Sequence, residues 1–535
     1  MRTSKQPQSK GNIHSYYHQQ MDQYCYSDFQ ILNNNNNITP VETPQTTQIS
    51  VQTCDDSYFT LESSPAVGYL MYDSPAGASI SSSRSPFSQE VSQSCVSEPN
   101  HSWDNNDSSP VSGSSNISIV DDNMWNILKD LEKKLMDSEN DSTSCQTSSS
   151  CQLMETTHSL EALDLKHVLI DCALAISNEE YQKAVRLMET LENMVSVSGD
   201  PFQRLAAYVL EGLRARLLSS GNIIYKKLKC NEPTGSELMS YMSVLYHICP
   251  YYKFAYTSAN IIIGEAMQTE NRIHIIDFCI AQGSQWIAFI QSIANRPGGP
   301  PFIRVTGVDD SDSFHARGGG MDIVGKRLKE VARSCRVPFE FHGAAMSGCE
   351  VKLENLGIRE GEAVAVNFPF MLHHMPDESV TTSNHRDRLI RLVKSLSPKV
   401  VTLVEQESNT NTSSFMPRVL ETLEYYTAMF ESIEAGCTKD EKKRISAEEH
   451  CVARDIVNII ACEGEERVER HELFGKWRAR IMMAGFQQCG LSPYVSMAVK
   501  DMLREFSPNY KIAEMNGALY LGWKNRAMAT LSAWR

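Results

Sequence analysis

Five short runs of apolar and β-branched residues recur through the second half of the chain, and they constrain the fold more than any other feature. Helical stretches separate most of these runs, which cover residues 273–278, 302–308, 338–344, 363–368 and 399–406. Strands that are apolar throughout are buried on both faces, and strands that alternate with helices pair in parallel. The sequence therefore predicts an α/β fold with a doubly wound parallel sheet.

The C-terminus adds a different signal. Two strand-like runs flank Lys524, Asn525 and Arg526, and this pattern predicts an antiparallel hairpin. A parallel sheet that ends in such a hairpin is typical of Rossmann-like, methyltransferase-like folds. A fold of this kind does not fix the chemistry, because function depends on the site and not on the scaffold.

Amphipathic helices precede the sheet from about residue 158 and predict an N-terminal α-helical cap. Their apolar side chains look more numerous than one core face requires, and exposed apolar surface typically marks a protein interface. We therefore predict that the cap forms homo- or heterodimers, with interface candidates at Leu169, Leu187, Leu191 and Leu213.

Residues 1–157 have a composition typical of disorder, being rich in Ser, Asn and Gln. The first 150 residues also carry a net charge of −11 out of −15 for the whole chain. One amphipathic stretch, 119–137, predicts a short helix. Two interpretations remain open for it: a transient helix without a role, or a segment that folds on a partner.

Composition excludes several classes of function. The remainder of the chain is nearly neutral, so no strongly basic nucleic-acid surface is indicated. The 15 cysteines show no CxxC or Cys/His ligand spacing, which favours free thiols over disulfides or a zinc site. The sequence also contains no apolar run of membrane-spanning length and no signal peptide, so we expect a soluble intracellular protein without membrane contact.

A cofactor site of this fold would lie at the strand ends, because ligands of doubly wound folds bind there. Asp277 ends the first strand, Asp309 and Asp310 end the second, and Asn367 ends the fourth. The loop after the first strand offers Gly283 alone, however, whereas a cofactor close to the backbone requires several glycines. We therefore expect no bound cofactor, and an S-adenosylmethionine-dependent methyltransferase remains the alternative.

The adjacent histidines His373 and His374 are the only other conspicuous pair. On a helix their side chains would diverge by about 100°, so we predict that they do not share a metal ion and that they lie in a surface turn. The alternating charges of residues 467–472 fit a network that fixes elements against one another, or a surface that faces a partner. No catalytic, cofactor-binding or metal-binding residue is predicted.

Several motifs in order resemble the GRAS transcriptional regulators of plants. The VHIID motif of that family corresponds to Ile273, His274, Ile275, Ile276 and Asp277, and its extension to Gln282, Gly283, Gln285 and Trp286. The resemblance covers 158–535 and divides it into leucine repeat I (163–223), the VHIID region (242–307), leucine repeat II (323–355), PFYRE (364–460) and SAW (463–535). Structural residues of the last two regions would be Pro369, Phe415, Tyr426, Arg467, Glu469, Trp477, Trp523 and Trp534.

The chain is similar to the scarecrow-like branch that includes phytochrome A signal-transduction proteins. The resemblance implies a regulator of transcription that is not an enzyme and that acts in the nucleus and sometimes also in the cytoplasm. The implied partners are other GRAS proteins and DNA-binding transcription factors. Direct sequence-specific DNA binding stays open as an alternative. Within the motif, we expect Asp277 and Gln282 to hold the strand–helix turn by hydrogen bonds, while His274 and Trp286 pack in the core.

Overall fold

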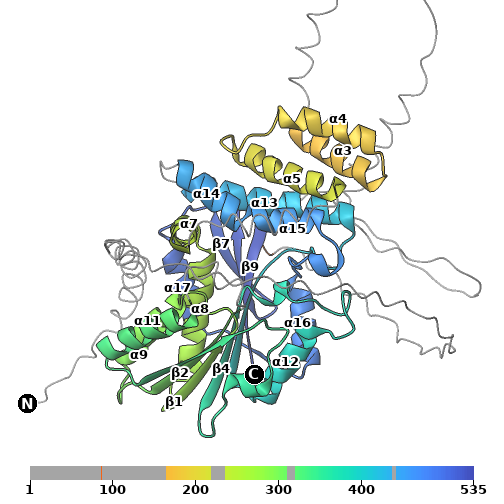
Figure 1. Cartoon of the computed structure of the whole chain (residues 1–535). Coiled ribbons are helices and arrows are strands. Elements are labelled where there is room, and N and C mark those ends of the chain that lie inside the picture. Colours follow the sequence, from red (N-terminus) through yellow and green to blue (C-terminus); the bar gives the residue numbers. More distant parts are fainter. Residues whose placement is uncertain (1–85, 87–163, 219–234, 310–319, 437–440) are drawn as a thin grey trace, which may run out of the picture. The chain divides into compact units, whose positions relative to one another are not determined.

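The computed structural model describes residue 86 and residues 164–218, 235–309, 320–436 and 441–535. The expectations for 1–157, including the helix at 119–137, therefore lie outside the described residues apart from residue 86. All elements discussed below belong to the unit that contains 164–535 (Figure 1).

A nine-stranded mixed sheet forms the centre of the described part. Its order is β3-β2-β1-β4-β5-β9-β8-β7, and β6 (Gln488–Cys489) pairs with β9. The five predicted strands form a parallel set: β1 (Arg272–Asp277), β2 (Phe302–Asp309), β3 (Phe339–Ala345), β4 (Ala363–Pro369) and β5 (Val400–Gln406). The sheet confirms the predicted doubly wound, methyltransferase-like fold.

The C-terminal strands run antiparallel to this set. β8 (Ala518–Trp523) and β9 (Arg526–Trp534) form the predicted hairpin around Lys524 and Asn525, and β9 pairs with β5. A further edge strand that the sequence analysis missed, β7 (Tyr510–Met515), pairs with β8. The predicted hairpin is therefore part of a three-stranded meander.

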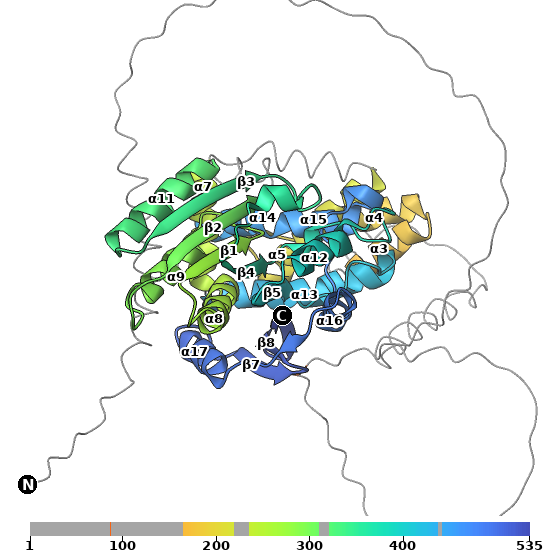
Figure 2. The same cartoon turned by 90° about the horizontal axis from the view of Figure 1, so that it is seen from below.

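Helices cover both faces of the sheet, as alternating side chains require. Ile273 and Ile275 of β1 share a core with α8 (Tyr251–Ala266), α9 (Ser284–Ala294) and α11 (Met321–Ser334). Ile276, on the opposite face, packs in a second core with α12 (His385–Ser395) and α16 (Phe474–Met483). Figure 2 shows the two groups of helices on either side of the strands. The helix α17 (Pro493–Leu503) packs against α8 and β7.

The predicted cap is built from two distant parts of the sequence. Its N-terminal helices are α3 (Leu165–Ser177), α4 (Tyr181–Glu192) and α5 (Pro201–Leu217). The helix α5 packs against α13 (Phe415–Gly436) and α15 (Ala453–Ala461), which follow β5 in the chain (Figure 1). The helices α7 (Gly235–Ile248) and α14 (Glu441–Cys451) pack against each other and also contact α13 and α15, respectively.

Local chemistry explains how α5 begins and why it lies so close to α15. Asp200 caps the helix by accepting hydrogen bonds from the backbone N–H groups of Phe202 and Gln203, and Gln203 completes a capping box. Further along α5, a Cβ placed on Gly212 would lie 2.9 Å from the Cβ of Ile460, so only glycine allows this approach.

The structure corrects the predicted dimer interface. Leu169, Leu191 and Leu213 are completely buried in the core that the cap helices share with α13 and α15, and Leu187 is partly buried against that core. The apolar stripes looked too broad for one core face because the second set of helices, distant in sequence, was not anticipated. These three leucines are therefore not available to a partner.

Three short 3₁₀ helices complete the described elements: η3 (Leu353–Leu356), η4 (Leu372–His374) and η5 (Gly464–Glu466). Among the described residues, no helix combines the length and the hydrophobicity needed to span a membrane.

Candidate functional site

Asp277 lies at the end of β1, where a ligand of this fold class would be expected, but its carboxylate is engaged by the protein. Its Oδ2 accepts a hydrogen bond from Nε1 of Trp286 at 2.5 Å, and its Oδ1 accepts one from the backbone N–H of Cys279 at 3.2 Å. Burial raises the pKa of Asp277 to about 7. The carboxylate thus ties the strand to the first turn of α9.

Side-chain amides continue this network from Asp277 across the strand ends. Asn367 Nδ2 lies 3.4 Å from Asp277 Oδ1 and donates to Gln285 Oε1 at 3.1 Å, while Asn367 Oδ1 accepts from Thr402 Oγ1 at 2.7 Å. Gln285 Nε2 in turn donates to Asn260 Oδ1 on α8 at 3.2 Å. All of these side chains are buried. The network links β1, β4, β5, α8 and α9 through groups that satisfy one another.

The loop that follows β1 is packed tightly against β2. A Cβ on Gly307 would lie 2.8 Å from Cγ1 of Ile280, so the Ile280 side chain occupies the space over that strand. Asp309 Oδ2 accepts a hydrogen bond from the backbone N–H of Ala281 at 3.2 Å. Gly283 has a φ of 74°, a left-handed conformation that favours glycine, and it immediately precedes α9. The single glycine of the loop thus serves the turn.

The other motif residues divide into buried apolar groups and one buried histidine. Ile273, Ile275 and Ile276 are completely buried. His274 is buried and hydrogen-bonded: Nε2 lies 2.8 Å from Thr306 Oγ1 and Nδ1 lies 2.9 Å from Arg304 Nη2. Burial and the nearby Arg304 lower the pKa of His274 to about 3, so the imidazole is neutral and accepts from the arginine.

Gln282 does not have the predicted role. Its side chain is partly buried and makes no hydrogen bond within the described part of the chain. Gln285, one helical turn further along, makes the contacts instead because its side chain points toward Asn260 and Asn367. Trp286 is completely buried, as predicted, and also acts as the donor to Asp277.

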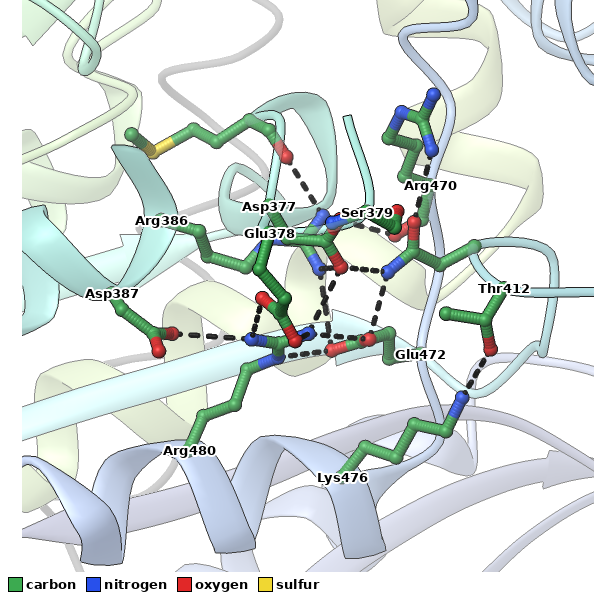
Figure 3. Close-up of polar contacts among 12 residues, drawn as sticks. Asp377, Glu378, Ser379, Arg386, Asp387, Thr412, Arg470, Glu472, Lys476 and Arg480 are labelled. Atoms are coloured by element: carbon green, nitrogen blue, oxygen red, sulfur yellow. Dashed lines mark hydrogen bonds and ion pairs between the residues drawn. The ribbon is translucent and has the colours of Figure 1, made fainter. Parts of the chain in front are cut away.

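A second polar cluster, which we call the Arg480 cluster, joins the segment 375–387 to the segment 467–480. Figure 3 shows the guanidinium of Arg480 among four carboxylates. It donates to Glu472 at 2.7 Å and 3.0 Å, to Asp377 at 2.9 Å, and to Glu378 and Asp387 at 2.9 Å and 3.1 Å. Burial of Arg480 lowers its pKa, but the surrounding carboxylates outweigh this effect and raise the pKa above its usual range.

Arg386 lies deeper in the Arg480 cluster and is completely buried. Its Nη1 lies 3.2 Å from Glu472 Oε2, and its Nη2 donates to the carbonyl oxygen of Met375 at 2.8 Å. The guanidinium stacks over the ring of Trp477 at 4.8 Å. Asn411 completes the cluster by donating to Asp377 and to Glu472. The arrangement fixes three chain segments against one another.

Arg467 and Glu469, two of the predicted structural residues, are also buried. Arg467 Nη2 donates to the carbonyl oxygen of Asn411 at 2.9 Å and Nη1 to that of Thr410 at 2.5 Å. Of the two interpretations of this charged segment, the burial favours the network that fixes elements together.

The histidine pair lies in a turn, as predicted, but only one of its two side chains is at the surface. His373 and His374 belong to η4, a single 3₁₀ turn. Nε2 of His373 lies 3.4 Å from Glu469 Oε2, and Nε2 of His374 lies 3.4 Å from Glu469 Oε1. His373 is buried, whereas the His374 side chain is 45% exposed. The pair thus converges on one carboxylate.

The remaining predicted structural residues are dispersed over the unit. Pro369 is buried at the end of β4, and Tyr426 is buried in α13. The ring centroid of Phe415, at the start of α13, lies 3.9 Å from Cζ of the Arg216 guanidinium. Three tryptophans are buried: Trp477 in α16, Trp523 with Nε1 donating to Glu431 at 2.9 Å, and Trp534 with Nε1 donating to Ser532 at 2.9 Å.

Sequence reasoning missed the residues that complete both clusters. Asn260, Thr402, Asp377, Arg386 and Arg480 were not singled out because none of them belongs to a recognisable motif. Most of their partners are distant in the chain, as for Asn411 with Asp377, 34 positions apart, and Arg480 with Asp377, 103 positions apart. Spacing along the sequence carries no signal for such contacts.

Comparison with known proteins gives a consistent result. The GRAS domain family model matches residues 165–535. Scarecrow-like protein 13 of Arabidopsis thaliana is 54% identical over 100% of this chain and 99% of its own length. The scarecrow-like transcription factor PAT1 of the same plant is 59% identical over 71% of this chain and 78% of its own.

A solved structure agrees with these sequence matches. The crystal structure of SCL7 from Oryza sativa superposes with a TM-score of 0.62 at 31% identity, covering 70% of this chain and all of the other. The family model spans every element from α3 to β9, including the closed strand-end network and the Arg480 cluster. The chain belongs to the GRAS domain family.

Proposed function

We propose that this protein is a plant regulator of transcription that acts through protein–protein interactions and not as an enzyme. The observation that carries the proposal is the closed network at the strand ends. Asp277, Asn367 and Gln285 hydrogen-bond to one another or to neighbouring protein groups, where an enzyme of this fold would present such groups to a ligand. Family membership and the name of the PAT1 relative, a transcription factor, support the regulatory role.

The proposed partners are other GRAS proteins and DNA-binding transcription factors. The buried leucines of the cap cannot provide this contact, but the outer side of α4 can. Tyr181 and Val185, one helical turn apart, are 53% and 44% exposed, and the partly buried Leu187 belongs to the same helix. Apolar side chains exposed together on one helix face are a typical interaction surface. We place self-association or pairing with a relative on this face.

We propose the nucleus as the site of action, with a further cytoplasmic pool. The support is the family membership together with the transcription-factor name of one relative. Expression of the full chain with a fluorescent tag in plant cells tests this location. Exclusion of the tagged protein from the nucleus would contradict it.

Transcriptional activity is tested by tethering the full chain to a heterologous DNA-binding domain next to a reporter gene in plant cells. We expect the tethered chain to change reporter expression relative to the DNA-binding domain alone. In parallel, S-adenosylmethionine should leave the melting temperature of the full chain unchanged. A silent reporter together with a clear increase in melting temperature would favour the methyltransferase alternative.

Association is tested with Val185→Glu in the full chain, because Val185 is exposed and its replacement should leave circular dichroism unchanged. We would sediment the Val185→Glu variant at high micromolar concentration, alone and together with a tagged relative. We expect neither the self-associated form nor the complex with the relative. Met483→Glu is the matched control, since Met483 is 77% exposed but lies on α16. A wild-type chain that remains monomeric and binds no relative would contradict the proposed interface.

A further inference from the structure

Three metal-ligating side chains converge at one point beside the Arg480 cluster. His373 and His374 come from η4 and Glu469 from the segment that follows η5, and their ligand atoms all lie within 4.8 Å of one another. The two shortest approaches, from each histidine Nε2 to one Glu469 oxygen, are both 3.4 Å. Each histidine therefore faces a different oxygen of the same carboxylate.

Each of these two nitrogen–oxygen distances is close to the length of one edge of a tetrahedral metal site. Zinc binds histidine nitrogen and carboxylate oxygen at about 2.0–2.2 Å, so two of its ligands lie roughly 3.3–3.5 Å apart. Direct hydrogen bonds between charged nitrogen and oxygen are shorter, at about 2.7–2.9 Å. The spacing of 3.4 Å is therefore long for a direct bond and suitable for an ion that lies between the groups.

Two buried atoms around this point lack a hydrogen-bond partner among the described residues. Glu469 Oε2 is buried and accepts no hydrogen bond from the described residues, and the same holds for Nε2 of His471, 3.7 Å away. A buried carboxylate oxygen without a donor costs about 1–3 kcal/mol or more. A cation at this position would satisfy the oxygen.

The surroundings of His373 are those of an oriented metal ligand. Its Nδ1 lies 2.6 Å from Glu405 Oε2, which holds the ring and leaves Nε2 to face Glu469. Glu405 itself accepts from the backbone N–H of Leu372 at 2.8 Å and from that of Met371 at 3.2 Å. A carboxylate that orients a histidine in this way is the usual outer partner of zinc-bound histidines.

We propose that His373, His374 and Glu469 bind a divalent transition-metal ion of the zinc class. Two imidazole nitrogens and one carboxylate suit zinc and not calcium or magnesium, which prefer oxygen ligands. Three protein ligands leave a fourth position, and the half-exposed His374 keeps that side open to water or to a ligand of a partner protein. The ion would fasten the turn after β4 to the segment between η5 and α16.

A proton is the competing occupant. A proton on His373 would lie between two carboxylates, because Nδ1 is 2.6 Å from Glu405 Oε2 and Nε2 is 3.4 Å from Glu469 Oε2. A protonated His373 would partner both carboxylates without involving His374. The role of His374 therefore distinguishes the two occupants.

The experiment is metal titration of the full chain after chelator treatment, with His374→Ala as the test variant. Because His374 is exposed, its removal should leave the fold intact, as checked by circular dichroism. We expect the variant to bind one zinc ion per chain fewer than wild type and to lose the metal-dependent rise in melting temperature. Cobalt should give visible d–d absorption without a thiolate charge-transfer band, which separates this site from any cysteine site.

His167→Ala provides the matched control, because His167 is an exposed histidine on α3. This variant should bind as many metal ions per chain as wild type. Glu469→Gln is the second variant, and it should also lose one bound ion. Equal zinc stoichiometry in wild type and His374→Ala, or the same cobalt spectrum in both, would overturn the proposal. Magnesium should give no stabilisation, and stabilisation by magnesium equal to that by zinc would likewise contradict it.

Discussion

The strand-end network and the Arg480 cluster both bury polar groups, but they do so by different means. The strand-end network contains a single buried acid, Asp277, held by the indole of Trp286, the backbone N–H of Cys279 and the side-chain amide of Asn367. The Arg480 cluster contains buried arginines and carboxylates in direct contact. The first joins strands that are already paired in the sheet, whereas the second joins segments that are not paired as strands.

The difference shows what each region requires. Neighbouring parallel strands are already held by backbone hydrogen bonds, so their polar side chains need only complete the closure of the strand ends. The segments 375–387 and 467–480 share no strand ladder, and charged side chains hold them together. Removing a partner should therefore cost more in the Arg480 cluster than at the strand ends.

The largest expected effect follows from Arg386→Ala. The substitution leaves Glu472 and Asp377 without one of their buried cations, and breaking a buried ion pair in this way costs about 3–5 kcal/mol. Urea unfolding of the full chain measures this loss. Arg504→Ala is the control, because Arg504 is 81% exposed and its pair with Asp501 should contribute less than about 1 kcal/mol. Similar losses for both variants would remove the distinction between the two regions.

A smaller effect is expected from Trp286→Phe. The phenyl ring keeps most of the packing but removes the N–H that donates to Asp277, and a buried acceptor left unpaired costs about 1–3 kcal/mol. Trp523→Phe should cost less, because its acceptor, Glu431, is 33% exposed and can bind water instead. Thermal unfolding of the two variants compares them directly. A larger loss of stability in Trp523→Phe than in Trp286→Phe would show that the hydrogen bond to Asp277 does not stabilise the fold.

A further expected effect is a pH dependence that belongs to Asp277. Its pKa rises from 3.8 to about 7 on folding because the carboxyl is buried, so the folded state binds the extra proton in this interval. The stability that this protonation contributes is complete below about pH 4 and is lost as the pH rises through 7. The stability difference between wild type and Asp277→Asn should therefore shrink from pH 4 to pH 7. A difference that grows over this interval would show that the buried group is charged throughout.

The parallel sheet could be predicted because its signal is local. The runs at 273–278 and 363–368 are continuously apolar, and such runs read as buried strands without knowledge of their partners. The edge strand β7 was missed because it mixes exposed Lys511 and partly buried residues, which gives no apolar run. Asp277 and Trp286 could be singled out for the same local reason, since a strand, a turn and a helix follow in order.

The rest of the site could not be predicted because its contacts are distant in sequence. Arg204 of α5 pairs with Glu448 of α14, 244 positions away, and no local pattern marks either residue. The same distance hid the packing of α5 on α15 and led to the assignment of Leu213 to a dimer interface. The convergence of His373 and His374 on Glu469 was missed because Glu469 is distant from both in the sequence.

The central claim is that the strand ends are closed by the protein itself and serve as structure. The most direct test is the free energy of unfolding of the full chain with Asp277→Ala, measured together with binding of S-adenosylmethionine by the wild type. We expect a loss of roughly 1–3 kcal/mol or more, because the indole N–H of Trp286 and the backbone N–H of Cys279 lose their acceptor, and no binding of S-adenosylmethionine. Wild-type stability in Asp277→Ala, combined with S-adenosylmethionine binding that this substitution abolishes, would contradict the claim.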